Sequence, residues 1–146
     1  MQYFEDIEVG TKSSFGHYEV TREEVIAFAS KYDPQPFHLS DEAAAATHFG
    51  RLSASGWHTC AMTMSMVVEN FKASRQAGLG SPGIDELRWT APVRPGDTLH
   101  GRVTVDEVRE SSKDPKRGTV LTTSEVFNQD DVLVMRIRAR GFFARR

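Results

Sequence analysis

After a short strand pattern near the start, the spacing of apolar residues changes from helical periodicity to alternation in the second half of the chain. In residues 25–32 and 57–71 the apolar positions recur every three or four residues, as on one face of an amphipathic helix. From Leu87 onward they alternate with polar residues, which is typical of antiparallel strands with one buried face. The pattern therefore predicts an α+β fold in which a curved antiparallel sheet wraps around the longest helix.

A short strand over 15–20 precedes the first predicted helix, which begins at Thr21. The run Thr21-Arg22-Glu23-Glu24 has the form of a capping box, in which the threonine oxygen accepts a backbone N–H and the glutamate reaches back to the cap. An apolar face follows, made of Val25, Phe28, Ala29 and Tyr32. We expect the helix to end at Asp33-Pro34, because proline keeps the residue before it out of the helical region.

Two further helices are predicted before residue 77. Ser40 is placed to cap a short helix over 41–48, with Gly50 as its stop. The longest helical pattern, from residue 57 to about residue 76, contains Trp57, Cys60, Ala61, Met62, Met64, Met66, Val67, Val68 and Phe71. We expect this helix to be buried along much of its length, with its methionines as core filling or, alternatively, as the lining of an acyl-binding site.

Four strands are predicted after the loop at 80–83. They cover residues 87–91, 99–105, 119–127 and 133–139, separated by polar or turn-forming segments. No repeat or linker interrupts the pattern, and 146 residues suffice for one ordinary domain, so we expect a single domain over 1–146.

Composition narrows the classes of partner and compartment. The chain has 18 basic and 20 acidic residues, a net charge of −2, which gives no overall attraction to nucleic acid or to a membrane surface. Cys60 is the single cysteine, so an internal disulfide and a cysteine-based metal site are excluded. The N-terminus has no signal-peptide pattern, and no apolar run has transmembrane length. We expect a soluble cytoplasmic protein that binds neither nucleic acid nor membrane.

The stretch Asp33-Pro34-Gln35-Pro36-Phe37-His38 carries the candidate chemistry. Its two prolines stiffen the backbone, so an acid and an imidazole are displayed a few residues apart on a rigid loop. Such a pair is suited to general acid–base catalysis. The alternative is structural: a helix stop and a turn, in which Asp33 caps backbone N–H groups and His38 is a packed or surface side chain.

A second feature, Ser55-Gly56, lies directly before the longest predicted helix. Backbone N–H groups at a helix start have no internal partner and carry the positive end of the helix dipole, so they can stabilise an oxyanion. Hydration of an enoyl thioester needs an activated water, a proton for the α-carbon and stabilisation of the charge on the carbonyl oxygen. Asp33, His38 and the Gly56 N–H are a set that meets these needs.

The sequence from Phe28 to Ala44 resembles the signature of the MaoC-like dehydratases, also called R-specific enoyl-CoA hydratases. That signature runs acid, any residue, asparagine, proline, aliphatic residue, histidine. The matching positions run from Asp33 to His38, with Ala44 at the small-residue position downstream. The resemblance continues through residues 49–51, 55–58, 87–89 and 91–98, and so covers most of the chain.

The resemblance implies a hotdog fold and the hydration of a 2-enoyl-CoA to an (R)-3-hydroxyacyl-CoA. By this likeness Asp33 and His38 activate the water and shuttle its proton, and the Gly56 N–H holds the thioester carbonyl. The likeness also implies an acyl-CoA substrate, no metal or organic cofactor, and a homodimer or larger homo-oligomer. The open edge of a single curved sheet leads to the same expectation of self-association.

Five further positions are candidate contacts to the substrate: Ser55, Gln35, Phe37, Tyr32 and His58. Gln35 stands where the family has asparagine, and Ser55 where many members have histidine before the glycine. Phe37 replaces an aliphatic residue and Tyr32 a smaller one, so we expect both to shape the acyl pocket. His58 lies one turn inside the helix and is a candidate lining residue.

Two other functions fit the same fold. A thioesterase would direct water at the carbonyl carbon, with Glu69 on the long helix as the acid. A non-catalytic acyl-CoA-binding subunit would keep the shape of the site without turnover, although the retained Asp33 and His38 argue against it. Release of free thiol from saturated acyl-CoAs identifies the first, and CoA-ester binding without turnover identifies the second.

The remaining reactive side chains are interpreted as structural. The other histidines have no metal-ligand spacing, and Cys60 lies on an apolar helix side, as a small buried residue does. Arg136, Arg138 and Arg140 alternate along one predicted strand. We interpret them as a solvated face, with contact to the CoA phosphates as the alternative.

Overall fold

The computed structural model describes residues 1–146 as one antiparallel five-stranded sheet with three α-helices. The strands are β1 (Lys12–Glu19), β2 (Gly83–Trp89), β3 (Thr98–Glu110), β4 (Arg117–Phe127) and β5 (Leu133–Ala144). The helices are α1 (Arg22–Tyr32), α2 (Asp41–Ala45) and α3 (Gly56–Ser74), with 3₁₀ turns at Phe4–Asp6 and Pro36–His38. In space the strands follow the order β1-β3-β4-β5-β2.

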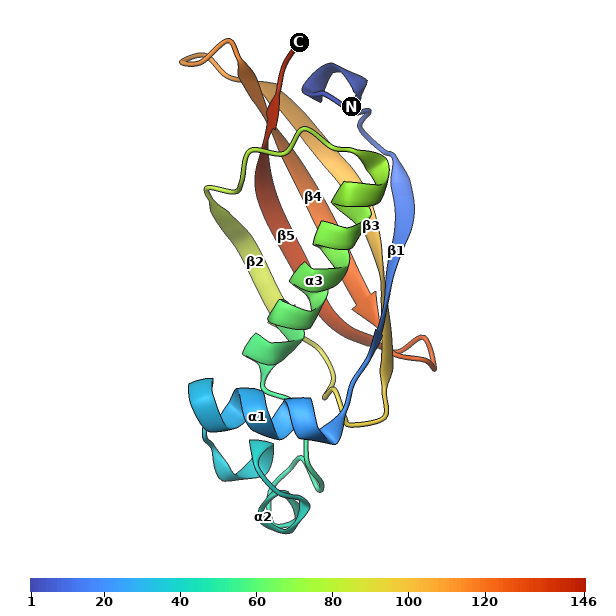
Figure 1. Ribbon diagram of the computed structural model, residues 1–146, viewed down its shortest axis with the longest axis vertical. Helices are drawn as coiled ribbons and strands as arrows, with labels where there is room; N and C mark the ends of the chain where they lie inside the picture. Colours follow the sequence, from blue (N-terminus) through green and yellow to red (C-terminus); the bar gives the residue numbers. More distant parts are fainter.

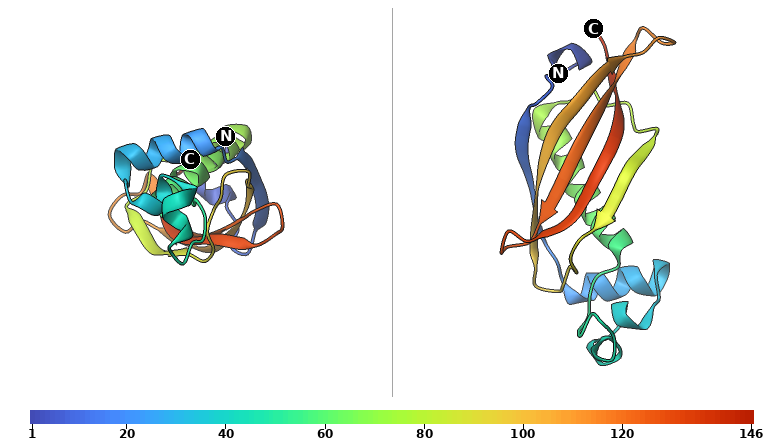
Figure 2. Two further views of the ribbon diagram at one scale, coloured as in Figure 1. Left: turned by 90° about the horizontal axis from the view of Figure 1, so that it is seen from below. Right: turned by 180° about the vertical axis from the view of Figure 1, so that it is seen from behind.

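The sheet curves around α3, which lies along its concave face (Figure 1). No helix covers the opposite face (Figure 2), where charged pairs such as Arg102 with Glu125 are found. α1 and α2 lie together at one end of the sheet, beside the start of α3 (Figure 1). An antiparallel sheet wrapped around a long helix is the hotdog arrangement, so the expected α+β hotdog fold is confirmed. None of the helices combines the length and apolarity needed to cross a membrane.

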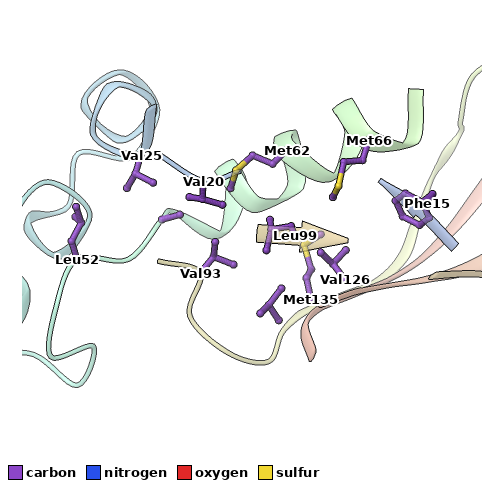
Figure 3. Close-up of a cluster of buried hydrophobic side chains, with 12 residues drawn as sticks. Phe15, Val20, Val25, Leu52, Met62, Met66, Val93, Leu99, Val126 and Met135 are labelled. Carbon is purple, nitrogen blue, oxygen red and sulfur yellow. The ribbon is translucent and has the colours of Figure 1, made fainter. Parts of the chain in front are cut away.

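The main core fills the space between α3 and the sheet (Figure 3). Met62 and Met66 from α3 join Leu99 and other strand residues in one buried cluster. The cluster runs from Phe15 at one end to Val25, on α1, at the other (Figure 3). Because α1 contributes to the same core as α3, the loop that follows α1 is held against the start of α3.

α1 begins at the predicted cap and ends at the predicted stop. The Thr21 hydroxyl accepts the Glu24 N–H at 3.3 Å, and Asp33 is the C-cap before proline. The other half of the predicted capping box is wrong, because the Glu24 carboxylate bonds Tyr18 and His58 instead of reaching back to the cap. α2 is shorter than predicted, ending at Ala45 rather than at residue 48.

The sheet strands lie close to the predicted segments. β3, β4 and β5 each contain the predicted positions and extend beyond them, whereas β2 begins earlier than predicted, at Gly83, and ends at Trp89. β1 and β2 are the two edges of the sheet, and each is paired on one side only.

α3 has an exposed apolar face, which differs from the expected burial along much of the helix. The buried residues are His58, Thr59, Met62, Thr63 and Met66. Trp57, Met64 and Val68 are exposed, Trp57 to 58%. Thr59 and Thr63 can face the core because their hydroxyls donate to helix carbonyls one turn earlier. The apolar residues Trp57, Met64 and Val68 therefore lie on the outer side of the helix, away from the core that Thr59 and Thr63 face.

Candidate active site

The structure brings the Asp33 and His38 side chains together beside the start of α3. Asp33 directly follows α1, and His38 ends the 3₁₀ turn that begins at Pro36. The turn is closed by the His38 N–H, which donates to the Gln35 carbonyl at 2.9 Å. His38 Nε2 lies 3.4 Å from Asp33 Oδ2. The spacing of acid and base in the sequence therefore places both groups at one point in space.

His38 is buried and held on both sides of its ring. Nδ1 lies 2.8 Å from the Ser53 carbonyl oxygen. A carbonyl only accepts, so Nδ1 carries a proton, and in the neutral ring Nε2 is a free acceptor facing Asp33. His38 is 5% exposed, and its ring meets the Phe37 ring edge-on at 4.6 Å. Phe49 stacks on Phe37 and completes the apolar side of the site.

The Asp33 carboxylate accepts one hydrogen bond on each oxygen. Gln35 Nε2 donates to Oδ1 and Ser55 Oγ donates to Oδ2, both at 2.7 Å. Burial of Asp33 raises its pKa, but the bonds from Ser55 and Gln35, together with the nearby His38, outweigh it and hold the pKa below the usual value. Asp33 is therefore a carboxylate at neutral pH, facing a histidine nitrogen that is free to accept a proton.

The first turn of α3 is shaped by Ser55, Gly56 and Trp89. Ser55 is the N-cap, and its Oγ accepts the Trp57 N–H at 3.2 Å while it donates to Asp33. The Trp89 indole N–H donates to the Gly56 carbonyl at 2.9 Å. A Cβ on Gly56 would lie only 2.5 Å from the Trp89 ring, so no larger residue fits there without movement. The Gly56 N–H is a first-turn donor with no partner inside its own helix.

The predicted substrate contacts fall into two groups. Gln35, Ser55 and Phe37 contact Asp33 or His38 directly. Tyr32 is exposed and packs on Phe28 at 5.1 Å, outside those contacts.

His58 also belongs to the second group. It lies one turn along α3, where its Nε2 is 3.1 Å from Glu24 Oε1 and its ring stacks on Phe28 at 4.6 Å. The structure thus separates a site around Asp33 from a second polar cluster around Glu24.

Three residues of the site were not among the predicted contacts, although two of them, Phe49 and Trp89, lie in segments that the family resemblance covers. Ser53 acts through its backbone carbonyl, which no side-chain motif can indicate. Phe49 and Trp89 reach the site from a loop and from the end of β2. Trp89 lies 33 residues after Gly56, so only the closed sheet brings the two together.

The arrangement suits proton transfer to and from a bound molecule. It offers a carboxylate, a histidine nitrogen fixed as an acceptor, and a backbone N–H at the positive end of a helix. No group of three or more histidine, cysteine, aspartate or glutamate side chains is clustered as a set of metal ligands would be.

Comparisons with known proteins identify the relatives of this chain. The sequence model described as "MaoC like domain" matches residues 6–127, a range that includes every residue of the site from Asp33 to Trp89. The chain is 35% identical over 108 residues to a Methylorubrum extorquens protein named 3-hydroxybutyryl-CoA dehydratase. That match covers 73% of this chain and 65% of the dehydratase, so the chain spans less than two thirds of that relative.

Two comparisons cover nearly the whole chain. The (R)-specific enoyl-CoA hydratase of Rhodospirillum rubrum is 29% identical over 144 residues, 97% of this chain and 95% of that protein. The crystal structure of a MaoC-like dehydratase from the same organism is 38% identical and has a TM-score of 0.90, with 100% of this chain and 99% of that chain covered.

Proposed function

The chain belongs to the family of MaoC-like dehydratases, and from this premise we propose that it is a hydro-lyase that adds water reversibly to the double bond of a 2-enoyl-CoA. The product is a 3-hydroxyacyl-CoA. The observation that carries the proposal is the buried His38, whose free nitrogen faces the Asp33 carboxylate next to the first turn of α3. Two relatives whose names state this chemistry support it, and one of those names supports R stereochemistry.

In the proposed reaction, a water molecule bridges Asp33 Oδ2 and His38 Nε2. His38 removes a proton from the water while Asp33 orients it, and the oxygen forms a bond to the β-carbon. The electrons of the double bond move onto the thioester, giving an enolate. The protonated His38 then delivers the proton to the α-carbon, so that the pair returns to its starting state and one water has been added.

The Gly56 N–H stabilises the enolate oxygen in this proposal. The helix dipole adds to the effect, because Gly56 is the first residue of α3. Ser55 serves both parts of the reaction, since it caps the helix and donates to Asp33. The reaction uses no metal or organic cofactor, because the proton transfers and the charge stabilisation come from the chain itself.

Thioester hydrolysis has less support than hydration, because Glu69 is too far from Gly56 of the same chain. Glu69, the acid proposed for it, pairs with Lys72 at 2.8 Å on the exposed side of α3. Glu69 lies 14 residues beyond Ser55, which is about 21 Å along a helix that rises 1.5 Å per residue. A carboxylate at that distance does not act on a carbonyl held at Gly56.

We also propose that the protein is a homodimer formed through α3 and β2. Trp57, Met64 and Val68 form an exposed apolar stripe on α3, and Ile84 and Trp89 are exposed on the edge strand β2. The edge strand also leaves backbone hydrogen-bonding groups free for a second sheet. A second copy that joins the sheets along β2 would cover the stripe by the same contact.

A panel of CoA esters tests the proposed reaction. We expect loss of enoyl absorbance with butenoyl-, hexenoyl- or octenoyl-CoA and no release of free thiol from the saturated esters. Thiol release from saturated esters without any hydration would show instead a thioesterase. Binding of the esters with neither reaction would show a non-catalytic subunit.

A further inference from the structure

A second polar cluster lies beside the proposed active site, in a pocket between β1, α1 and α3. The pocket has a volume of about 210 Å³ and is lined by Tyr18, Glu24, Ala27, Phe28, His58, Ala61 and Met62. Most of this lining is apolar, but three polar side chains meet in it. Tyr18 and His58 both bond the same oxygen of Glu24, Oε1.

A bulge in β1 places Tyr18 in this pocket. Phe15 pairs with Gly101 and Tyr18 with Leu99, so three steps along β1 match two along β3. Without the extra residue, Tyr18 would point to the opposite face of the sheet from Phe15. Gly16 allows the bulge, since it has a φ of +83° and a Cβ there would lie 2.4 Å from Met66 Sδ.

The cluster carries a negative charge with no lysine or arginine within ion-pair distance. Burial raises the pKa of Glu24, but the hydrogen bonds from Tyr18 and His58 outweigh it and hold that pKa below its usual value. Burial and the bond to Glu24 raise the pKa of Tyr18 to about 12, so the phenol keeps its proton. No lysine or arginine pairs with Glu24.

His58 does not supply the missing cation. The ring is 3% exposed, and Nδ1 is buried without a hydrogen-bond partner. A charged imidazolium would leave an unsatisfied N–H at Nδ1, so this environment suits the neutral ring with its proton on Nε2, donated to Glu24. Glu24 therefore faces the pocket as an anion with two neutral donors on Oε1, while Oε2 accepts no hydrogen bond from the protein and the Glu24 side chain is 45% exposed.

Two helices connect this pocket to the proposed active site. α1 runs from Glu24 and Phe28 to Asp33, and α3 runs from Ser55, which bonds Asp33, to His58 and the pocket. The three residues from Ser55 to His58 correspond to about 4.5 Å along the helix axis. A chain of a few carbons that starts at Asp33 is therefore long enough to span the distance along α3 from the proposed active site to the pocket.

We propose that this pocket binds the distal end of the substrate's acyl chain and selects chains whose end carries a hydrogen-bond donor, a hydroxyl or an ammonium group. The inference rests on the proposed function, because it identifies the ligand as an acyl-CoA. The free oxygen of Glu24 receives the donor, and the apolar walls receive the methylene groups. A purely alkyl end is disfavoured, since it would remove water from the carboxylate without replacing the hydrogen bond.

The test measures binding of saturated acyl-CoAs by calorimetry, which requires no turnover. Hexanoyl- and octanoyl-CoA are compared with the same esters bearing a terminal hydroxyl or amino group. We expect at least one donor-bearing ester to bind about tenfold more tightly than its methyl counterpart, as for a hydrogen bond to a charged group. Glu24→Gln should abolish the preference for the amino end.

The matched control is Glu23→Gln, which removes the same charge from the exposed neighbouring position on α1. It should keep the wild-type preference. Equal or weaker binding of both donor-bearing esters at every chain length would overturn the inference, whether or not the protein hydrates enoyl-CoAs. An absence of hydration together with a donor preference lost in Glu24→Gln would overturn the proposed reaction and leave the pocket assignment standing.

Discussion

At the scale of single residues, the chemistry of the site depends on how Asp33 is held. Its two carboxylate oxygens accept from Gln35 and Ser55, and Oδ2 also faces His38. These partners keep Asp33 ionised at neutral pH. The carboxylate then has no proton to give to His38, so the free nitrogen of His38 can take a proton from water. Gln35 in place of the family's asparagine thus has a defined contact.

Gln35→Ala should raise the pKa of Asp33, because one of the two hydrogen bonds to the carboxylate is lost. In the wild type the folded-state pKa is lowered, so ionised Asp33 stabilises the fold above its unfolded pKa, and that stabilisation is lost as pH falls through the folded pKa. Denaturant unfolding should therefore show the variant less stable at neutral pH by about 1 kcal/mol. At a pH below both the folded-state and the unfolded-state pKa of Asp33, the difference in stability between the variant and the wild type should vanish.

Lys12→Ala, at an exposed position on β1, is the control for this measurement and should show no such pH dependence. An equal loss of stability by Gln35→Ala at neutral and acidic pH would mean that Gln35 acts through packing rather than through the Asp33 charge.

At the scale of elements, the start of α3 combines a cap, a glycine and a strand end in one contact. Ser55 caps the helix, and Gly56 leaves room for the Trp89 ring at the end of β2. The Trp89 indole in turn donates to the Gly56 carbonyl, so the first turn of the helix is fixed to the sheet. The proposed oxyanion donor is therefore positioned by an element distant in sequence.

Gly56→Ala should lower both the melting temperature and the hydration rate, because its Cβ would overlap the Trp89 ring. Overpacking of this kind typically costs about 1–3 kcal/mol. Gly78→Ala is the matched control, since a Cβ there meets nothing within 4 Å. Thermal unfolding and crotonyl-CoA hydration of both variants check the prediction, and a Gly56→Ala protein with wild-type values would contradict it.

Local signals in the sequence were sufficient for the elements that depend on neighbouring residues. Thr21 and the proline after Asp33 were enough to predict where α1 begins and ends, and the Asp33 to His38 spacing was enough to predict that acid and base lie together. Contacts between distant segments could not be predicted in this way. Glu24 leaves its cap because a bulge in β1 brings Tyr18 to it.

The buried face of α3 is the clearest case of a property that the sequence pattern does not determine. Both sides of the helix are apolar enough to face a core, and Thr63 is buried although it is polar. Met64, its neighbour, is exposed. The choice depends on the fit to the sheet, and the periodicity of a single helix carries no information on that fit.

At the scale of the whole molecule, the sheet and α3 leave one side of the protein open. The apolar stripe of α3 is next to the free edge of β2 at its Trp57 end, where the Trp57 and Trp89 rings meet with centroids 5.1 Å apart. Exposed apolar groups beside an unpaired strand edge are typical of a surface that another chain covers. The proposed homodimer accounts for both features with a single interface.

Val68→Glu should convert the proposed dimer to monomers, because it places a charge within the apolar stripe, at the end away from Trp57. Light scattering at micromolar concentration should give twice the 16.3 kDa chain mass for the wild type and the single mass for the variant. Lys72→Glu, four residues along the helix at an exposed charged position, is the control and should stay dimeric. A compact wild-type monomer at that concentration would contradict the proposed dimer.

The most direct test of the central claim is the rate of crotonyl-CoA hydration by Asp33→Asn and His38→Ala, measured beside the wild type and an Asp130→Asn control in an exposed turn. We expect each site variant to lose at least about 100-fold in kcat, as removal of a general acid–base group does, with its fold intact by circular dichroism. The control should keep the wild-type rate. Wild-type hydration by either folded site variant would contradict the assignment of that residue, and wild-type hydration by both would contradict the account of the active site.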